Sequence, residues 1–349
     1  MKIALVNDTH FGARGDSPIF NKYFFKFWEG TFFPYLKEHN ISQICHLGDV
    51  VDRRKFINFV TLRSWRQRFF DVLQREDITM DVIVGNHDVF HKNTNEINAL
   101  KELLSSYAFD VHTEATNITI DSCPILLVPW ITLQNESHTM RMIEETKAQI
   151  CMGHFEIAGF SMYRGMESHD GLSKDTFNKF DLVFSGHYHH RSSDGQIHYL
   201  GNPYELTWQD YNDPRGFHLF DTGTRRLDFI ENPYRMFARL EYSDREKDPI
   251  DLDAYDLKGL YVKLIVVDKT DYYKFDTFIK KLYNKGCHEI KIIEDMSEFN
   301  DGEIGEEINL EDTLSVLSHY IDSIETDVDK EHVKTYMRTL YTEAVNIEV

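Results

Sequence analysis

The first third of the chain repeats one pattern, in which a short apolar run ends in polar residues and a helix-period stretch follows. Apolar runs of strand length occupy residues 2–7, 43–47 and 79–84, and helical periodicity covers residues 20–38 and 58–74 between them. This alternation predicts strand–helix–strand units in a mixed sheet, where ligands gather outside the carboxyl ends of the strands. We therefore expect three successive strands to deliver polar side chains to one edge.

The region that follows is richer in strands. Further short strands are expected at residues 111–112, 118–120, 125–128, 149–152, 181–184, 217–221 and 226–230, with a helix at residues 136–147. Two of these strands again end in polar residues, at His154 and at His187. The sequence thus predicts an α/β fold in which two mixed β-sheets pack together and helices flank them.

The motif-bearing region stops near residue 232, and this break suggests the domain boundaries. Residues 1–234 form the expected main domain, and residues 235–295 carry a strand, helix and strand pattern of a small α+β domain. Residues 296–309 lie within an acidic stretch, since residues 294–312 carry nine acidic side chains and no Lys or Arg. That composition is typical of a solvated linker. The remainder, residues 310–349, is expected to form a pair of helices.

Each terminal helix carries one apolar stripe at helical spacing. The stripes consist of Leu310, Leu314, Leu317, Ile321 and Ile324, and of Val333, Met337, Leu340, Tyr341 and Ala344. Such stripes fit docking on a partner helix, and they also fit packing of the pair on its own domain. The acidic linker before them favours docking.

Charge and cysteine content bound the possible functions. The formal net charge is −20, and residues 241–349 alone carry 27 acidic and 13 basic side chains, a net charge of −14. A chain this acidic binds phosphate backbones poorly unless cations, local basic patches or a partner supply attraction. The four cysteines are dispersed without a Cys-x-x-Cys pair, and we find no apolar run of transmembrane length and no signal-peptide pattern. We therefore expect a cytoplasmic protein without a membrane role.

The polar strand ends form a mixed set of oxygen and nitrogen donors. Its members are Asp8, His10, Asp49, Asn86, His87, His154, His187 and His189. Carboxylate, amide and imidazole ligands suit Mn²⁺, Fe or Zn²⁺ better than Ca²⁺. The set is large enough for two ions if one carboxylate bridges them. Two metals about 3.5–4 Å apart are the usual arrangement for in-line attack at phosphorus.

These residues fall into five motifs that resemble those of the calcineurin-like metallophosphoesterases. The motifs are Asp8-x-His10, Gly48-Asp49-x-x-Asp52, Gly85-Asn86-His87-Asp88, Gly153-His154 and Gly186-His187-x-His189. The resemblance implies a four-layer sandwich with two metal sites. One would be held by Asp8, His10, Asp49 and His189, and the other by Asp49, Asn86, His154 and His187. It also implies that His87 is a general acid, oriented with help from Asp52 and Asp88.

Two later segments narrow the resemblance to SbcD-type nucleases, which include phage recombination endonuclease subunits. They are residues 201–207, Gly-Asn-Pro-Tyr-Glu-Leu-Thr, and residues 213–217, Asp-Pro-Arg-Gly-Phe. The resemblance implies two Mn²⁺ ions, with Mg²⁺ or Fe²⁺ as alternatives, exonuclease action on duplex DNA and endonuclease action on single strands. It further implies a homodimer and a coiled-coil SMC-like ATPase partner, gripped by residues 310–349, in recombination and double-strand-break repair.

Three basic residues after the second motif, Arg53, Arg54 and Lys55, are candidates for contact with the DNA backbone. They are equally consistent with a solvated helix start. Two rival functions also remain. A small-molecule phosphodiesterase or nucleotide pyrophosphohydrolase would share the metal motifs, and a binding subunit would keep the motifs without activity.

Overall fold

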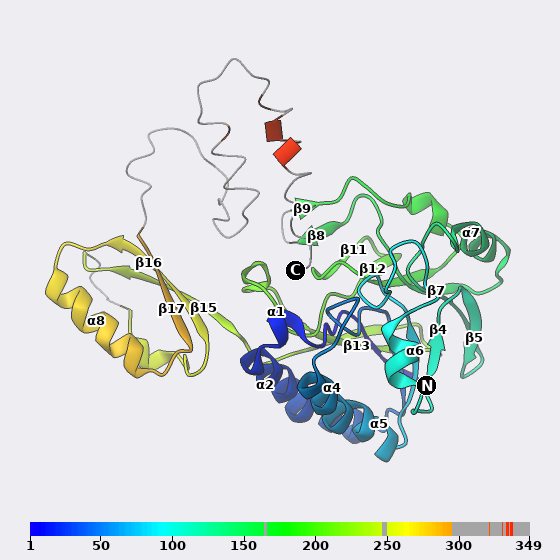
Figure 1. Cartoon of the computed structure of the whole chain (residues 1–349), viewed down its shortest axis with the longest axis horizontal. Coiled ribbons are helices and arrows are strands. Elements are labelled where there is room, and N and C mark those ends of the chain that lie inside the picture. Colours follow the sequence, from blue (N-terminus) through cyan, green and yellow to red (C-terminus); the bar gives the residue numbers. More distant parts are fainter. Residues whose placement is uncertain are drawn as a thin grey trace. The chain divides into compact units, whose positions relative to one another are not determined.

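The computed structural model describes residues 1–163, 166–245 and 250–294, together with Ile321, Lys330, Val333, Lys334, Tyr336 and Met337 (Figure 1). Met1–Ile293 is one compact unit and Glu294–Val349 is another. The expected linker at residues 296–309 lies outside the described residues, as does the helix pair at residues 310–349 except for these six helical positions. Within the described residues, none of the helices is long and apolar enough to cross a bilayer.

The first sheet contains the three strands that the opening pattern predicted. Its order is β14–β13–β1–β2–β3–β4, with β1 to β4 parallel and β13 and β14 antiparallel to their neighbours. The strands are β1 Lys2–Val6, β2 Gln43–His46, β3 Thr79–Ile83, β4 Asp110–His112, β13 Gly216–Asp221 and β14 Leu227–Glu231. In the first three, the strand ends one residue before the predicted boundary, so the polar residues follow in loops.

The second sheet has the order β11–β12–β10–β7–β6–β5, with a parallel centre and one antiparallel strand at each edge. Its strands are β5 Thr116–Ile120, β6 Cys123–Val128, β7 Ile150–His154, β10 Leu182–Gly186, β11 Ser192–Ser193 and β12 Ile197–Tyr199. A separate hairpin joins β8 Ser161–Tyr163 to β9 Met166–Glu167. The sequence patterns did not predict β8, β9, β11 or β12, which have two or three residues each.

One hydrophobic cluster lies between the two sheets, and one lies on the outer face of each sheet. This arrangement follows because alternate residues of a strand face opposite sides of its sheet. Ile3 and Leu5 of β1 point into the cluster between the sheets, where they meet Ile150 and Met152 of β7. Ala4 of β1 instead faces the cluster under the N-terminal helices. A third cluster covers the outer face of the second sheet. The predicted arrangement of two packed mixed sheets with flanking helices is confirmed.

Each of the two long predicted helices is interrupted by a π-helical turn. The first consists of α2 Pro18–Phe27, the turn Trp28–Phe32 and α3 Phe33–Glu38, and the second of α4 Phe59–Trp65, the turn Arg66–Phe70 and α5 Asp71–Arg75. In the first, Pro34 has no N–H to donate, and the Phe33 N–H bonds to the Trp28 carbonyl five residues earlier. The two helices lie side by side (Figure 1), with the Trp28 and Phe69 rings 4.8 Å apart edge to face.

The other described helices around the two main sheets have ten residues or fewer. They are α1 Ala13–Asp16, α6 Ala99–Leu104, α7 Glu136–Glu145 and the 3₁₀ turns Lys174–Phe177, Trp208–Asp210 and Leu252–Ala254. α7 is the helix expected at residues 136–147. α1 is not a regular helix, because three of its four residues, Arg14, Gly15 and Asp16, have positive φ angles.

A third sheet follows the two larger ones, in the order β15–β16–β17. Its elements are β15 Phe237–Ser243, β16 Tyr261–Asp268, α8 Tyr272–Asn284 and β17 Glu289–Glu294. Leu240, Leu264 and Leu282 are among the residues of its own core. These elements lie where the sequence patterns predicted a small α+β domain, at residues 235–295, and up to Ile293 they belong to the same compact unit as the two larger sheets. The sequence patterns missed β15.

Glu205 fixes the start of β15 to the main sheets. Its carboxylate is fully buried and accepts hydrogen bonds from the backbone N–H groups of Met236 at 2.5 Å and Phe237 at 3.0 Å. Burial raises the pKa of Glu205 from 4.5 to about 7, against the lowering effect of these two hydrogen bonds.

We therefore expect Glu205 to make stability depend on pH. Below pH 4.5 the folded and unfolded states are both protonated at this site, whereas above pH 7 the folded state carries the cost of a buried charge. Replacing Glu205 by Gln removes this cost. The free energy of unfolding of Glu205→Gln relative to wild type should rise by up to about 3 kcal/mol between pH 4 and pH 8, measured by urea titration. The exposed Glu96→Gln control should show no such trend.

Candidate metal centre

All the predicted ligands follow the carboxyl ends of parallel strands in the two main sheets. Asp8 and His10 come after β1, Asp49 after β2 and Asn86 after β3. In the second sheet, His154 is the last residue of β7, and His187 and His189 lie in the loop after β10. Since the two sheets pack face to face, their polar edges meet, as the sequence analysis expected.

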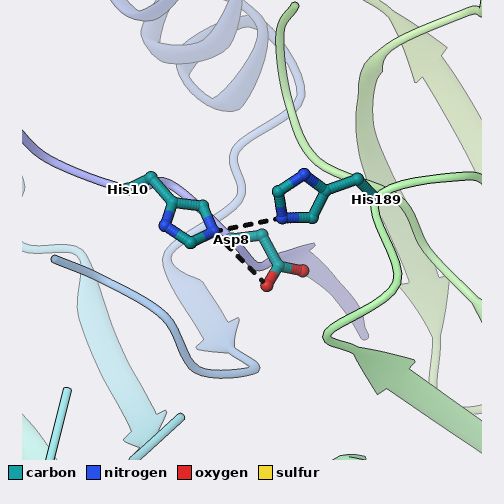
Figure 2. A group of neighbouring side chains, drawn as sticks. All are labelled: Asp8, His10 and His189. Carbon is teal, nitrogen blue, oxygen red and sulfur yellow. Dashed lines mark hydrogen bonds and ion pairs between the residues drawn. The ribbon is translucent and has the colours of Figure 1, made fainter. Parts of the chain in front are cut away.

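The first group of donors consists of Asp8, His10 and His189, whose ligand atoms lie within 4.8 Å of one another. Figure 2 shows the His10 ring pointing toward both other side chains. His10 Nε2 lies 3.1 Å from His189 Nε2 and 4.0 Å from Asp8 Oδ1. Three donors from the two sheets thus converge on one point.

The second group consists of Asp49, Asn86, His154 and His187. Asn86 Oδ1 lies 2.9 Å from His154 Nε2 and 3.0 Å from His187 Nδ1. Asp49 Oδ2 lies 3.4 Å from His154 Nε2, and the same oxygen lies 3.8 Å from His10 Nε2. The Asp49 carboxylate therefore borders both groups.

The loops that carry these donors have unusual backbone conformations. Asp8, Asp49 and His187 have positive φ angles of 50°, 55° and 84°. Non-glycine residues seldom adopt this region, and strain of this kind concentrates at functional sites. The loops also approach one another closely, since a Cβ added to Gly85 would lie 2.3 Å from the Asp49 backbone nitrogen. Only glycine fits at position 85.

Asp88 holds two of these loops together. Its buried carboxylate accepts four backbone hydrogen bonds: from Asp49 at 2.9 Å, Val50 at 2.9 Å, Val51 at 3.1 Å and Gly85 at 2.8 Å. The first three donors follow β2, and the fourth follows β3. From the motifs, we expected Asp88 to support its neighbours. The contacts show that it does so through the backbone.

His87 lines the cavity beside the donor groups, together with Asp52. Its Nδ1 lies 2.7 Å from the Asp52 backbone carbonyl, which favours a proton on Nδ1. Its backbone N–H donates to Asp49 Oδ1 at 2.8 Å. The Asp52 carboxylate is directed elsewhere, to 3.4 Å from His10 Nδ1. Asp52 thus positions His87 through its main chain and His10 through its side chain.

The buried carboxylates demand positive charge at the centre. Burial opposes protonation of His10, but the hydrogen bond to Asp52 and the charge of Asp49 raise its pKa to about 9. The pKa of His154 is likewise raised to about 9, because the charge of Asp49 outweighs the lowering effect of burial. Despite its burial, the pKa of Asp49 is held well below the usual value by His154 and His87. Burial and His154 lower the pKa of His187 to about 3.

One supporting residue lay outside the predicted set. Arg215 is buried and donates to the His189 carbonyl and to Asn202 Oδ1, as well as to Asp210 at 2.9 Å and Asp213 at 2.7 Å. It belongs to the Asp-Pro-Arg-Gly-Phe segment, which the sequence analysis used only to narrow the family. In the sequence, an arginine between a proline and a glycine gave no direct sign that it holds a metal-ligand loop.

The three predicted DNA-binding residues have partners within the protein. Arg53 forms an ion pair with Asp16 at 2.7 Å, and Arg54 donates to the Asn86 backbone carbonyl at 2.8 Å. Lys55 is also engaged in an interaction. Arg54 therefore helps to fix the loop of a predicted ligand, and DNA contact by the three remains a prediction.

The comparison with known proteins agrees with this geometry. A family model for calcineurin-like phosphoesterases matches residues 1–191, more than half of the chain. The chain belongs to the calcineurin-like phosphoesterase family. The family resemblance predicted from the five motifs is thereby confirmed.

Two curated relatives of this phosphoesterase are components of nucleases. It is similar to exonuclease subunit 1 of Enterobacteria phage T4, with 33% identity over 349 residues that cover 99% of each chain. It is also similar to the SbcD component of the SbcCD nuclease of Staphylococcus saprophyticus, with 22% identity over 54% of this chain and 48% of that one. A solved hypothetical protein from Thermus thermophilus aligns with 67% of this chain and 100% of its own at 14% identity, with a TM-score of 0.38, too loosely to bear on the site.

Calcineurin-like phosphoesterases depend on a dinuclear metal centre, and the donors found here fit one. Two carboxylates, an amide oxygen and four imidazoles converge in two adjoining groups, and the buried carboxylates of Asp8 and Asp49 favour cations there. The mixture of nitrogen and oxygen donors suits a transition metal.

Replacing Asp88 by Asn should disrupt the centre without touching a predicted ligand. The Asn amide would face two of the four backbone N–H donors, which would lose their acceptor in a buried site. We expect a loss of about 2–5 kcal/mol in unfolding free energy and weaker metal binding, measured by urea titration and metal analysis. The Asp175→Asn variant, on an outer 3₁₀ turn, is the matched control. Unchanged stability and metal content in Asp88→Asn would contradict this role.

Proposed function

We propose that this phosphoesterase is the nuclease subunit of a recombination and repair complex. It would cleave duplex DNA as an exonuclease and single strands as an endonuclease. The observation that carries the proposal is the 33% identity, over 99% of both chains, to a protein named as an exonuclease subunit. The converging donors at the edge of the two sheets supply a centre suited to phosphodiester hydrolysis.

Two groups of residues would hold the metals. Asp8, His10, Asp49 and His189 would hold one ion, and Asp49, Asn86, His154 and His187 the other, with Asp49 shared. We propose Mn²⁺ as the working ion, with Mg²⁺ and Fe²⁺ as alternatives. When bound, the pair would supply a water nucleophile and neutralise charge on the phosphate.

His87 would donate a proton to the leaving oxygen. Nδ1 donates to the Asp52 carbonyl, so the proton would leave from Nε2 of the imidazolium form, and the ring lines the cavity. A proton held on Nδ1 by the carbonyl keeps the ring in a fixed orientation. Its attachment to Asp49 through the backbone N–H keeps the ring beside the metal donors.

A small-molecule phosphodiesterase would need the same centre, but it explains less of the chain. The similarity to the phage subunit continues past the family match at residues 1–191 to the end of the chain. The three-stranded sheet from Phe237 to Glu294 therefore belongs to what the two proteins share. Cleavage of cyclic nucleotides with no cleavage of DNA would favour this alternative.

The His87→Gln variant tests the mechanism. Loss of a general acid should lower kcat on linear duplex DNA with Mn²⁺ by about 10²- to 10⁴-fold, while metal content stays at the wild-type level. The exposed histidine variant His91→Gln should cleave as wild type does. Undiminished cleavage by His87→Gln would refute the assignment of His87 as the proton donor.

We further propose two protein partners. A coiled-coil SMC-like ATPase would dock on residues 310–349, whose apolar stripes suit a helical partner. A second copy of the chain would pack against the start of α4, where Phe56, Phe59 and Val60 are all exposed, Phe59 to 83%. Exposed apolar clusters of this kind are typical of interaction surfaces.

A chain ending at residue 305 separates the two partners. It should lose co-purification with the ATPase but keep its metal content and its dimeric mass in light scattering, because Phe59 and the donor groups remain. Full-length Phe59→Glu should do the reverse and run as a monomer that still binds the ATPase. A truncated chain that still captures the ATPase would place docking elsewhere.

A further inference from the structure

The loop directly after the first motif has a constrained backbone that presents one arginine to the cavity. Gly12, Arg14, Gly15 and Asp16 have positive φ angles of 92°, 57°, 68° and 59°. The Ala13 N–H bonds to the His10 carbonyl at 2.9 Å, and the Asp16 N–H bonds to the Gly12 carbonyl at 2.9 Å. The loop therefore turns back on itself immediately beside a predicted metal ligand.

Asp16 anchors this loop to the rest of the domain. Its carboxylate accepts a hydrogen bond from Thr61 Oγ1 at 2.7 Å and forms an ion pair with Arg53 at 2.7 Å. Both partners come from the chain after β2, Thr61 from α4. Because Asp16 is held from two sides, the position of Arg14 two residues earlier is fixed as well.

Unlike Arg53, Arg14 has no acidic partner among the residues that the structure describes. Its guanidinium lies 5.6 Å from the Phe20 ring centroid, and within the described ranges no carboxylate pairs with it. Its backbone is left-handed at φ 57° and ψ 41°, a conformation that costs an arginine about 1 kcal/mol or more. Strain and an unpaired charge at one exposed residue point to a ligand for that charge.

The cavity that Arg14 lines is the one beside the metal donors. It has a volume of about 300 Å³ and also contains His10, Asp49, Asn86 and His87 on its polar side. His10 and Asp49 are buried, and Asn86 and His87 are half-buried, while Arg14 is exposed. These donors therefore form the floor of the cavity, and Arg14 lies at its rim. Met162 and Leu206 also line the cavity and give it an apolar wall, which suits a sugar or base.

We propose that Arg14 binds the phosphate next to the scissile one in a DNA strand, which makes it a specificity residue for polynucleotides. This inference rests on the proposed nuclease function. A guanidinium matches two phosphate oxygens with two hydrogen bonds, and a rim position reaches beyond the group held over the metals. In a chain of net charge −20, an unpaired cation at the entrance also offsets repulsion of the strand.

Arg14→Gly and Arg14→Ala test the proposal as a pair. Glycine accepts the left-handed backbone, so Arg14→Gly should fold at least as stably as wild type and rules out misfolding as a cause. For both variants, we expect the ratio of kcat/KM on a single-stranded oligonucleotide to kcat/KM on bis(p-nitrophenyl) phosphate to fall about 10- to 100-fold. The small substrate has one phosphate and no neighbour. The loss should lie mainly in KM.

A lysine variant and a distant arginine complete the design. Arg14→Lys should recover part of the lost ratio, since it restores the charge without the two-pronged geometry. The slope of log binding constant against log salt for the oligonucleotide should fall by about one in Arg14→Ala. Arg75→Ala, at the end of α5, should change neither quantity.

The possible outcomes distinguish an error in the role of Arg14 from an error in the proposed nuclease function. If Arg14→Ala cleaves DNA as well as wild type does, the role of Arg14 is wrong, but the nuclease function stands. An equal loss of activity on both substrates has the same meaning. Wild-type protein that hydrolyses the small phosphodiester and leaves DNA intact overturns the proposed nuclease function, and the role of Arg14 with it.

Discussion

The carboxylate of Asp88 is the constraint on which the metal centre depends. Four backbone N–H groups from two loops converge on its two oxygens in a buried site. Each donor would be costly to leave unpaired there, so the loops after β2 and β3 must keep one relative position. Asp49 and Asn86 take their places from that position. The absence of a side chain at Gly85 is what lets the two loops come close enough to share one acceptor.

Arg215 fixes a metal-ligand loop of the second sheet, as Asp88 fixes two loops of the first. It precedes β13 of the first sheet, yet it binds the His189 carbonyl in the loop after β10. Its charge is balanced by Asp210 and Asp213, and Asp213 also contacts His190 at 2.8 Å. Buried ion pairs contribute little net stability, but removing one partner is costly. The role of this cluster is therefore to fix one loop geometry, so that donors from two sheets meet.

The sequence predicted the parts of this protein that follow from periodicity. Strand-length apolar runs located β1, β2 and β3 to within a residue. These strands are buried on both faces, so most of their successive residues are apolar. It missed β11, which has two residues, and the π turn at Trp28, since neither has a repeat to detect. Side-chain partners were also beyond it. Arg53 looked free in sequence, but Asp16, 37 residues away, neutralises it only in the folded chain.

The distribution of strain shows what the layered core makes possible. Asp8, His10, Asp49 and His187 all have positive φ angles, in a region that residues other than glycine seldom adopt. Such conformations persist only where the surroundings overdetermine them. Here each follows a strand buried between a helix layer and a sheet, and the strands stay in register whatever the loops require. The stable layers thus allow the loops to present donors in directions that a regular strand end would not reach. Arg14 is a further example, because its strained backbone follows the first of these loops and is held there by the contacts of Asp16.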